Sequence, residues 1–224
     1  MLRLELSHLQ TAEFLYETRL FPEHAYTFKH ALTQQVAYET LLLERRRTLH
    51  ARIVVAIEAL YGDRLAEYVE QLAHHALRGE VGEKAAHYLR QAGNKAVARS
   101  ALPDARDRFE QAFGVLASLP ESSSMQEQGY EIRLELRSVL TTLGEIRRSL
   151  EHLREAETLA ERLHDDGRRG RVSAFALLAH NMLGDLDEAL VAGTRALEIA
   201  GRLGDLRLRL LTTTFLEQAH YYLL

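Results

Sequence analysis

The sequence predicts an all-α protein, an α-solenoid of helical hairpins that follows a small subdomain with a single β-hairpin. Three observations support this prediction. The 224 residues include only 3 prolines and 13 glycines, which favours helices joined by short turns. Apolar residues recur three and four positions apart along most of the chain, which is the spacing of one helix face. A pattern of forty residues also repeats within the helical part.

The N-terminal part differs from the rest of the chain. Aromatic and β-branched residues flank Pro22 between residues 14 and 28, a composition that predicts a β-hairpin. Helical spacing follows to the C-terminus, and we divide the chain into residues 1–61 and 62–224. The expected helices cover residues 41–60, 65–77, 85–98, 105–116, 132–143, 146–163, 172–183, 186–203 and 206–223.

Capping residues mark several expected helix boundaries. An oxygen-bearing side chain at the first turn can accept a hydrogen bond from an unpaired backbone N–H. The candidates for this role are Asp63, Ser124, Asp185 and Asp205. Glycine just after a helix allows the left-handed backbone that ends it, as expected at Gly79, Gly144, Gly184 and Gly204.

The repeat predicts how the helices should pair, although the helix at 81–98 could also be the second helix of a pair that starts near residue 64. Leu143-Gly144-Glu145 recurs forty residues later as Leu183-Gly184-Asp185. A further copy places Gly93 twelve positions before Ala105, which is followed by Phe109 and Ala112. This is the packing pattern of tetratricopeptide (TPR) repeats, in which small residues let helices approach and an aromatic ring fills the gap to the next pair. The copies are degenerate, because Ser149 replaces an alanine and Gly193 an aromatic residue.

The N-terminal residues resemble one bacterial family of multidomain regulatory proteins. Those proteins join a class III adenylate/guanylate cyclase, a STAND-type AAA-like ATPase and TPR repeats. The resemblance implies that residues 1–61 are a winged-helix subdomain that closes the ATPase module. The matching stretches are Phe14-Leu15-Tyr16-Glu17, Tyr26-Thr27-Phe28-Lys29-His30-Ala31-Leu32-Thr33, Val36-Ala37-Tyr38, Glu44-Arg45-Arg46-Arg47 and Leu49-His50.

The sequence departs from this family in two respects. Gln35 stands where the family has an acidic residue. More importantly, the 224 residues contain no cyclase catalytic domain, no Walker A loop and no Walker B strand. The chain therefore looks like a non-catalytic piece of such a protein. We expect it to require no cofactor and, by itself, neither to make a cyclic nucleotide nor to hydrolyse ATP.

The resemblance also implies a nucleotide sensor in the parent protein. In STAND ATPases a winged-helix histidine contacts the phosphate of bound ADP, and His30 occupies the matching position. The neighbouring Lys29, near an expected helix N-terminus, suits a group that faces a phosphate. The alternative is that His30 only caps or packs the junction between the hairpin and the next helix.

The helical repeats predict a second candidate site. First helices of TPR units line a concave face that receives peptides or other protein surfaces. Arg90 and Asn94 stand where carboxylate-binding TPR proteins have a basic residue and an asparagine, but Glu135 replaces a further asparagine of that pattern. We therefore predict a groove of mixed charge, lined by Arg90, Asn94, Glu131, Arg171 and Asn181.

Other charged patterns favour structural explanations. The run Arg45-Arg46-Arg47 could contact DNA, but residues 1–60 carry seven basic and seven acidic side chains, so they create no net positive field. Glu-x-x-His, the half-site spacing of di-iron proteins, occurs at residues 5–8, 161–164 and 217–220. These copies should lie far apart along a solenoid, so no metal site is predicted. His74-His75 is interpreted as a half-exposed helix face.

Four features of the whole chain limit its function. There is no cysteine, which excludes disulfides, thiolate metal sites and thiol nucleophiles. The net charge of −4 gives no general reason to bind nucleic acid. No apolar run reaches the ~18–20 residues that a membrane-spanning helix needs, and no signal peptide is recognisable. We therefore expect a cytoplasmic protein that does not associate with membranes.

Three functions remain open from the sequence. The first is a regulatory module that binds a protein or peptide in the TPR groove and controls a linked cyclase or ATPase. The second is a DNA-binding regulator that uses the winged helix, with the repeats as its sensor. The third is an enzyme fragment in which His30 contacts nucleotide only when the missing ATPase core is supplied.

The last expected helix raises the question of self-association. A solenoid normally ends in a polar capping helix, but no such helix is expected after the one that begins at residue 206. We expect either that the native protein continues past residue 224 or that the chain self-associates through this helix. The apolar side that we expect to be uncovered consists of Leu208, Leu211, Phe215, Ala219 and Tyr222.

Overall fold

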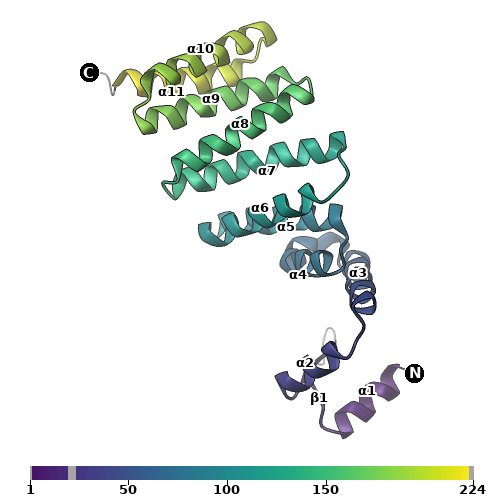
Figure 1. Ribbon diagram of the computed structural model, residues 1–224. Coiled ribbons are helices and arrows are strands. Elements are labelled where there is room, and N and C mark those ends of the chain that lie inside the picture. Colours follow the sequence, from purple (N-terminus) through teal and green to yellow (C-terminus); the bar gives the residue numbers. More distant parts are fainter. Residues whose placement is uncertain (1, 20–23, 222–224) are drawn as a thin grey trace.

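The computed structural model describes residues 2–19 and 24–221. This part of the chain is 81% helical and confirms the predicted all-α fold with one β-hairpin (Figure 1). A short 3₁₀ turn, Gly62–Arg64, precedes α4 and contains Asp63, so Arg64 rather than the predicted Asp63 is the N-cap of that helix. The elements are α1 (Leu2–Thr11), β1 (Leu15–Arg19), β2 (Ala25–Phe28), α2 (Ala31–Glu39), α3 (Leu43–Leu60), α4 (Leu65–Arg78), α5 (Gly82–Ala98), α6 (Leu102–Ala117), α7 (Ser123–Thr142), α8 (Ile146–Arg162), α9 (Asp166–Leu183), α10 (Leu186–Leu203) and α11 (Leu206–Tyr221).

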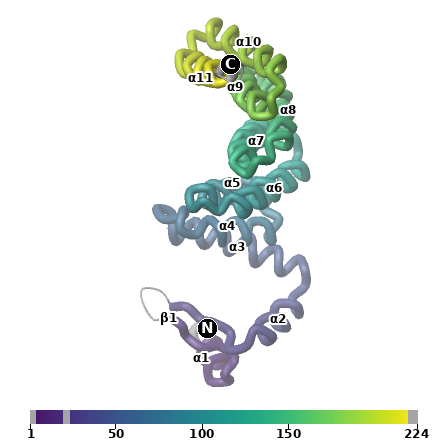
Figure 2. Tube along the Cα trace, turned by 90° about the vertical axis from the view of Figure 1, so that its left-hand side faces the viewer, coloured from purple at the N-terminus to yellow at the C-terminus, as the bar shows by residue number. Residues whose placement is uncertain are grey.

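The N-terminal elements lie apart from the main helical stack. Both views show α1, the hairpin and α2 beyond one end of the stack (Figures 1 and 2). The strands form the predicted antiparallel hairpin, in which Leu15 lies opposite Phe28. None of the side chains described before His50 is buried. This segment therefore has no hydrophobic core of its own.

Helices α3 to α11 form the α-solenoid. Each helix packs against the next along the chain, and α5 also contacts α7 while α9 contacts α11. The pairs α5–α6, α7–α8 and α9–α10 are the three predicted hairpins, and α11 begins a fourth. We call α5, α7, α9 and α11 the first helices and α6, α8 and α10 the second helices.

The first repeat packs as its sequence pattern predicts. Phe109 of α6 is fully buried at 0% exposure, and its ring lies against Gly93 of α5. A Cβ atom added to Gly93 would lie 2.6 Å from Cε1 of Phe109. The absence of a side chain on one helix therefore makes room for the ring of the other.

In the third repeat the large residue lies on the first helix and the glycine on the second, the reverse of the first repeat. The corresponding pair, also sixteen residues apart, is Leu177 of α9 and Gly193 of α10. A Cβ atom on Gly193 would lie 3.3 Å from Cδ2 of Leu177 and 2.7 Å from Cδ2 of Leu216. The leucines fill the space that the predicted aromatic residue would have occupied. The leucine side chains therefore replace the volume of the aromatic residue that the repeat lacks.

Helix boundaries confirm some of the predicted caps and correct others. Asp205 Oδ1 accepts a hydrogen bond from Leu208 N, as expected. Ser124 is not the cap of α7, because the N-cap lies two residues earlier, at Ser122, whose Oγ accepts from Met125 N. Asp185 occupies the N-cap of α10 but makes no side-chain capping bond. All four predicted glycines lie at the C-terminal end of a helix, but only Gly144, Gly184 and Gly204 have positive φ, whereas Gly79 ends α4 with a φ of −84°.

Helix α3 belongs to the same core as the repeats. Val54 and Ile57 of α3 are buried in one cluster with Val69 and Leu72 of α4. The predicted division at residue 61 assigns α3 to the N-terminal subdomain, and this division stays a prediction. Among the described residues, no helix is long and apolar enough to cross a membrane.

The C-terminal helix is covered more than expected. Leu208 is only 3% exposed and packs with Leu211 against α9 and α10. The prediction that this side of α11 is uncovered is therefore wrong for Leu208. Tyr222 and the side chain of Ala219 lie outside what the structure describes. Among the side chains of α11 that the structure describes, up to residue 218, the exposed large apolar ones are Leu206 and Leu210, at 66% and 60%.

Candidate functional site

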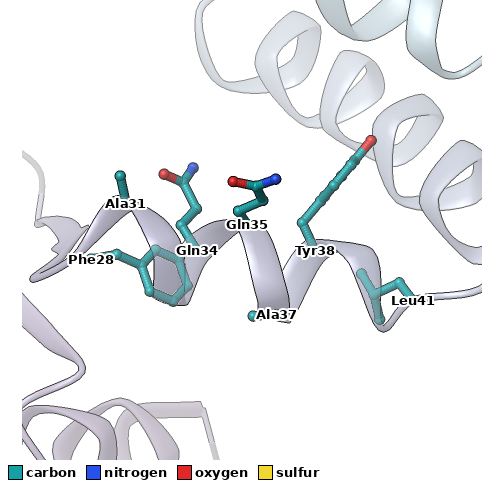
Figure 3. A pocket seen from close by; sticks show the side chains of 7 residues that line it. All are labelled: Phe28, Ala31, Gln34, Gln35, Ala37, Tyr38 and Leu41. Carbon is teal, nitrogen blue, oxygen red and sulfur yellow. The ribbon is translucent and has the colours of Figure 1, made fainter.

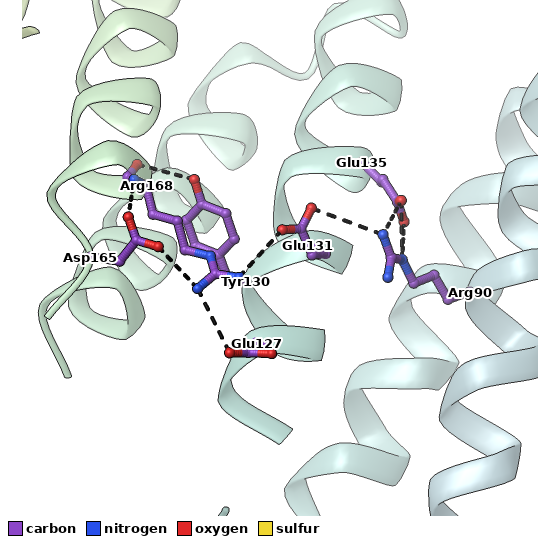
Figure 4. Close-up of polar contacts among 7 residues, drawn as sticks. All are labelled: Arg90, Glu127, Tyr130, Glu131, Glu135, Asp165 and Arg168. Atoms are coloured by element: carbon purple, nitrogen blue, oxygen red, sulfur yellow. Dashed lines mark hydrogen bonds and ion pairs between the residues drawn. The ribbon is translucent and has the colours of Figure 1, made fainter. Parts of the chain in front are cut away.

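A polar network crosses the first helices where the groove was predicted (Figure 4). Arg90 of α5 donates from Nε and Nη2 to the Glu135 carboxylate of α7, over 2.7–3.0 Å. Asn94 Nδ2 donates to Glu135 Oε1 at 3.2 Å. The hydrogen bond to Glu135 is the main cause that raises the pKa of Arg90. Arg90 and Asn94 therefore hold a carboxylate of their own chain.

Glu131 extends the network toward α9. One of its oxygens lies 4.0 Å from Arg90 Nη2, and the other lies 4.0 Å from Arg168 Nη2. Arg168 also pairs with Asp165 at 3.2 Å and with Glu127 at 3.9 Å. The predicted residue Glu131 thus bridges two arginines that belong to different repeats. Its contacts are long, which leaves the carboxylate able to exchange partners.

Tyr130 anchors the network to the core. Its ring is fully buried, and Oη donates to the backbone oxygen of Arg168 at 3.0 Å. Burial is the main cause that raises the pKa of Tyr130 to about 12, so the hydroxyl stays protonated at neutral pH. The guanidinium groups of Arg168 and Arg171 lie 5.3 and 5.6 Å from the centre of this ring. The tyrosine therefore joins α7 to α9 from below the charged surface.

The two predicted groove residues of α9 have different environments. Arg171 is exposed and lies beside Tyr130, where it can meet a ligand. Asn181 is only 8% exposed, and its Nδ2 donates to the Phe215 oxygen at 2.9 Å. Asn181 therefore braces α9 against α11 and is unavailable as a groove ligand. The structure brings together Arg90, Asn94 and Glu131 but leaves Asn181 outside this set.

Sequence analysis missed how Glu135, Arg168 and Tyr130 take part. Asn94 and Arg90 lie 41 and 45 residues from Glu135, and Tyr130 lies 38 residues from Arg168. These separations are close to one repeat length. Opposite charges about one repeat length apart in the sequence could therefore have indicated these contacts. The residues of one helix show which side chains share a face, but they do not show which carboxylate of the next repeat an arginine meets.

His30 and Lys29 lie at the start of α2. His30 is the N-cap residue, with extended backbone and no side-chain capping bond. Lys29 Nζ pairs with the Glu13 carboxylate, and this contact lowers the pKa of Glu13. Both side chains are exposed. The His30 side chain therefore does not cap the helix, although the residue occupies the capping position.

One face of α2 is hollow, with a pocket of about 420 Å³ (Figure 3). The pocket runs along the helix from Phe28 to Leu41, and Tyr38 extends from it toward the solenoid. Apolar side chains also lie elsewhere on α2, where Leu32 and Val36 are 70% and 53% exposed. Helix α2 therefore presents apolar surface that the described part of the chain leaves uncovered.

A histidine cluster joins α2, α3 and α4. Tyr38 Oη lies 3.1 Å from His50 Nε2, and His50 Nδ1 lies 2.7 Å from His75 Nδ1. Burial is the main cause that lowers the pKa of His75 to about 4. His75 is half-buried and His74 is exposed, in agreement with the predicted half-exposed face. In the described part of the chain, no group of three or more His, Cys, Asp or Glu could hold a metal ion.

The basic run at the start of α3 makes intramolecular contacts. Arg46 donates to the backbone oxygens of Leu41 and Glu39, and its guanidinium lies over the Tyr38 ring. Arg47 pairs with Glu80 at 2.8 Å. Two of the three arginines are therefore engaged within the chain, as the balanced local charge predicts.

Comparison with known proteins supports the fold of the chain. No protein-family model matches the chain. Among curated proteins, the chain is similar to the uncharacterized protein R02095 of Rhizobium meliloti (strain 1021), with 31% identity over 115 residues. The match covers 50% of this chain and 11% of the relative. The chain therefore spans about a tenth of that relative's length.

Two solved structures share the arrangement of helices. BtubC (BKLC) from P. vanneervenii has a TM-score of 0.55 and 16% identity, covering 86% of this chain and 85% of that chain. The nearly identical TPR-like repeats of a Podosopora anserina kinesin-light-chain-type protein also have a TM-score of 0.55, with 17% identity. That match covers 80% of this chain and 86% of the other. The fold of this chain is thus a TPR-like α-solenoid.

Proposed function

We propose that the chain is a non-catalytic protein-interaction module that binds a peptide or protein segment on its first helices. The observation that carries the proposal is the polar network from Arg90 through Glu131 to Arg168 across α5, α7 and α9. Consecutive repeats present charged side chains on one continuous surface, and such a surface can contact an extended partner at several points. Glu131, with two long ion contacts, is the member best placed to exchange an internal partner for a ligand.

The test begins with an unbiased library of random twelve-residue peptides displayed on phage. A selected peptide is then measured by fluorescence anisotropy against the whole chain. We expect Glu131→Gln to change its affinity at least threefold, because this carboxylate stands between two arginines. Glu151→Gln is the matched control, since Glu151 is exposed on the second helix α8. A library that yields no binder, or equal effects of the two variants, would contradict the proposal.

We further propose that the module is regulatory and belongs to a cytoplasmic cyclase/STAND ATPase-type signalling protein. The resemblance of residues 14–50 supports this context. Further support comes from the N-terminal elements, which lack a buried core and expose apolar side chains such as Leu32. Such a segment needs a neighbouring domain to cover it. The Rhizobium relative, of which 115 matched residues form 11%, shows that a related segment occurs within a large protein.

In that parent protein we propose that His30 and Lys29 face a nucleotide phosphate. Both side chains are exposed at the N-terminus of α2, where backbone N–H groups favour an anion. Lys29 would have to leave Glu13 to reach it. The sequence of the gene upstream of residue 1 tests the context directly. A Walker A loop and a cyclase domain there support it, and their absence contradicts it.

A further inference from the structure

Arg137 occupies a packing position that the other repeats fill with apolar residues. It lies sixteen residues before Leu153, just as Gly93 precedes Phe109 and Leu177 precedes Gly193. In the first and third repeats these pairs pack against each other between the helices of a hairpin. An arginine at this position carries a charge into a place where neither packing nor the repeat pattern requires one.

The guanidinium of Arg137 lies between α7 and α9 without a counter-charge. Its Cζ atom is 3.8 Å from the centre of the Phe175 ring of α9. The Nε atom is buried and has no hydrogen-bond partner. No ion pair of Arg137 is found in the described part of the chain, although neighbouring Arg133 pairs with Glu155 at 2.8 Å. Burial alone lowers the pKa of Arg137 to about 10, so the side chain is still charged at neutral pH.

The preceding repeat contains the carboxylate partner that Arg137 lacks. At the seam between α5 and α7, Arg90 meets the carboxylate of Glu135. Forty residues after Glu135, in α9, stands Phe175. At the seam between α7 and α9 the arginine therefore meets a ring where the earlier seam supplies a carboxylate. A ring stabilises a cation, but by less than a charged partner does.

A second arginine lies at the same seam. Arg171 precedes Phe175 by one helical turn and lies beside Tyr130 of α7. It is exposed, and no ion pair of Arg171 is found among the described residues. Two cations with no ion pair among the described residues, each beside an aromatic ring from the opposite helix, thus lie at this seam. The third arginine there, Arg168, differs because Asp165, Glu127 and Glu131 compensate its charge. Desolvated arginine next to an aromatic surface is well suited to planar carboxylate recognition.

We propose that Arg137 and Arg171 form a carboxylate-binding subsite at the α7–α9 seam, which receives an acidic segment of a bound peptide. This inference rests on the proposed function and specifies the chemistry of the partner. The neighbouring α5–α7 seam is already closed by Glu135, so the ligand carboxylates enter at the α7–α9 seam. A basic segment would meet two uncompensated cations there and is disfavoured.

The test measures three labelled hexapeptides, each with four variable positions occupied by glutamate, glutamine or lysine. We expect only the glutamate peptide to bind, with an affinity that falls as the salt concentration rises. Arg137→Met should weaken its binding at least tenfold, which corresponds to about 1.4 kcal/mol. Arg171→Gln should weaken it severalfold. Arg147→Gln is the control, because Arg147 is an exposed arginine of α8 outside the seam.

A stability measurement separates this role from packing. Methionine keeps the contact with the Phe175 ring but removes the unpaired charge. Arg137→Met should therefore melt at the same temperature as the wild type or higher while losing the peptide. A variant that melts lower and still binds the glutamate peptide would show that Arg137 only packs the seam, and would overturn the inference.

The remaining outcomes are also decisive. Equal loss of binding in Arg147→Gln would reduce the effect to general surface charge and overturn the subsite. Preference for the lysine peptide, or binding of none of the three, would overturn it as well. The proposed function is judged separately, because it fails only when the unbiased library yields no binder or when Glu131→Gln matches its control.

Discussion

Replacing Phe109 by alanine tests the physical basis of the repeat. The ring is fully buried, and it lies in the space left by Gly93 on the facing helix. Removing a buried phenylalanine ring costs about 3–5 kcal/mol, because apolar contacts are lost and a cavity remains. For a chain of this size the melting temperature should fall by about 6–20 °C. Circular dichroism during heating measures the change.

A double-mutant cycle with Gly93 localises the effect. Gly93→Ala alone should cost about 1–3 kcal/mol, because its Cβ would lie 2.6 Å from the ring. In the Phe109→Ala background the same methyl group enters a cavity and should cost less or even stabilise the chain. Gln111→Ala, an exposed substitution on the same helix, is the control. Additive effects, or a Phe109→Ala shift no larger than the control, would refute the repeat register.

Two further predictions concern the N-terminal half of the solenoid and the segment before it. His75 has a pKa of about 4 in the folded chain, below its ordinary value of 6.5, so the unfolded chain takes up the proton first. Stability to urea should therefore fall between about pH 6.5 and 4, by up to about 1 kcal/mol per pH unit, and His75→Gln should flatten this dependence. Limited proteolysis should cut near residues 40–42, between α2 and α3, because no described side chain before His50 is buried. A fragment from about residue 43 should keep its cooperative melting, and loss of that transition would show that the N-terminal elements support the solenoid.

Local patterns were sufficient to predict the hairpins of the solenoid. The pairing of Gly93 with Phe109 could be predicted because the two sizes are complementary at a fixed spacing. How the third repeat fills the space of the aromatic residue that Gly193 replaces could not be predicted. Gly193 is packed by Leu216 of the following repeat and Leu177 of its own, and compensation in volume between separate helices leaves no local signature.

The candidate site was only partly predictable for a related reason. Arg90 and Asn94 were identified by position, but their partner Glu135 was interpreted as a departure from a pattern rather than as the group they hold. Asn181 was assigned to the groove because its helical position suits one, whereas the presence of α11 makes it a brace. Contacts across repeats depend on how helices stack, and helical periodicity does not specify that stacking.

Hydrogen–deuterium exchange of the whole chain, with and without the selected peptide, tests the central claim most directly. The account predicts that binding slows amide exchange in the first helices α5, α7 and α9, with the largest effect near Glu131. The second helices α6, α8 and α10 should change little. Protection confined to those second helices, or to α1 and α2, would contradict the assignment of the binding surface.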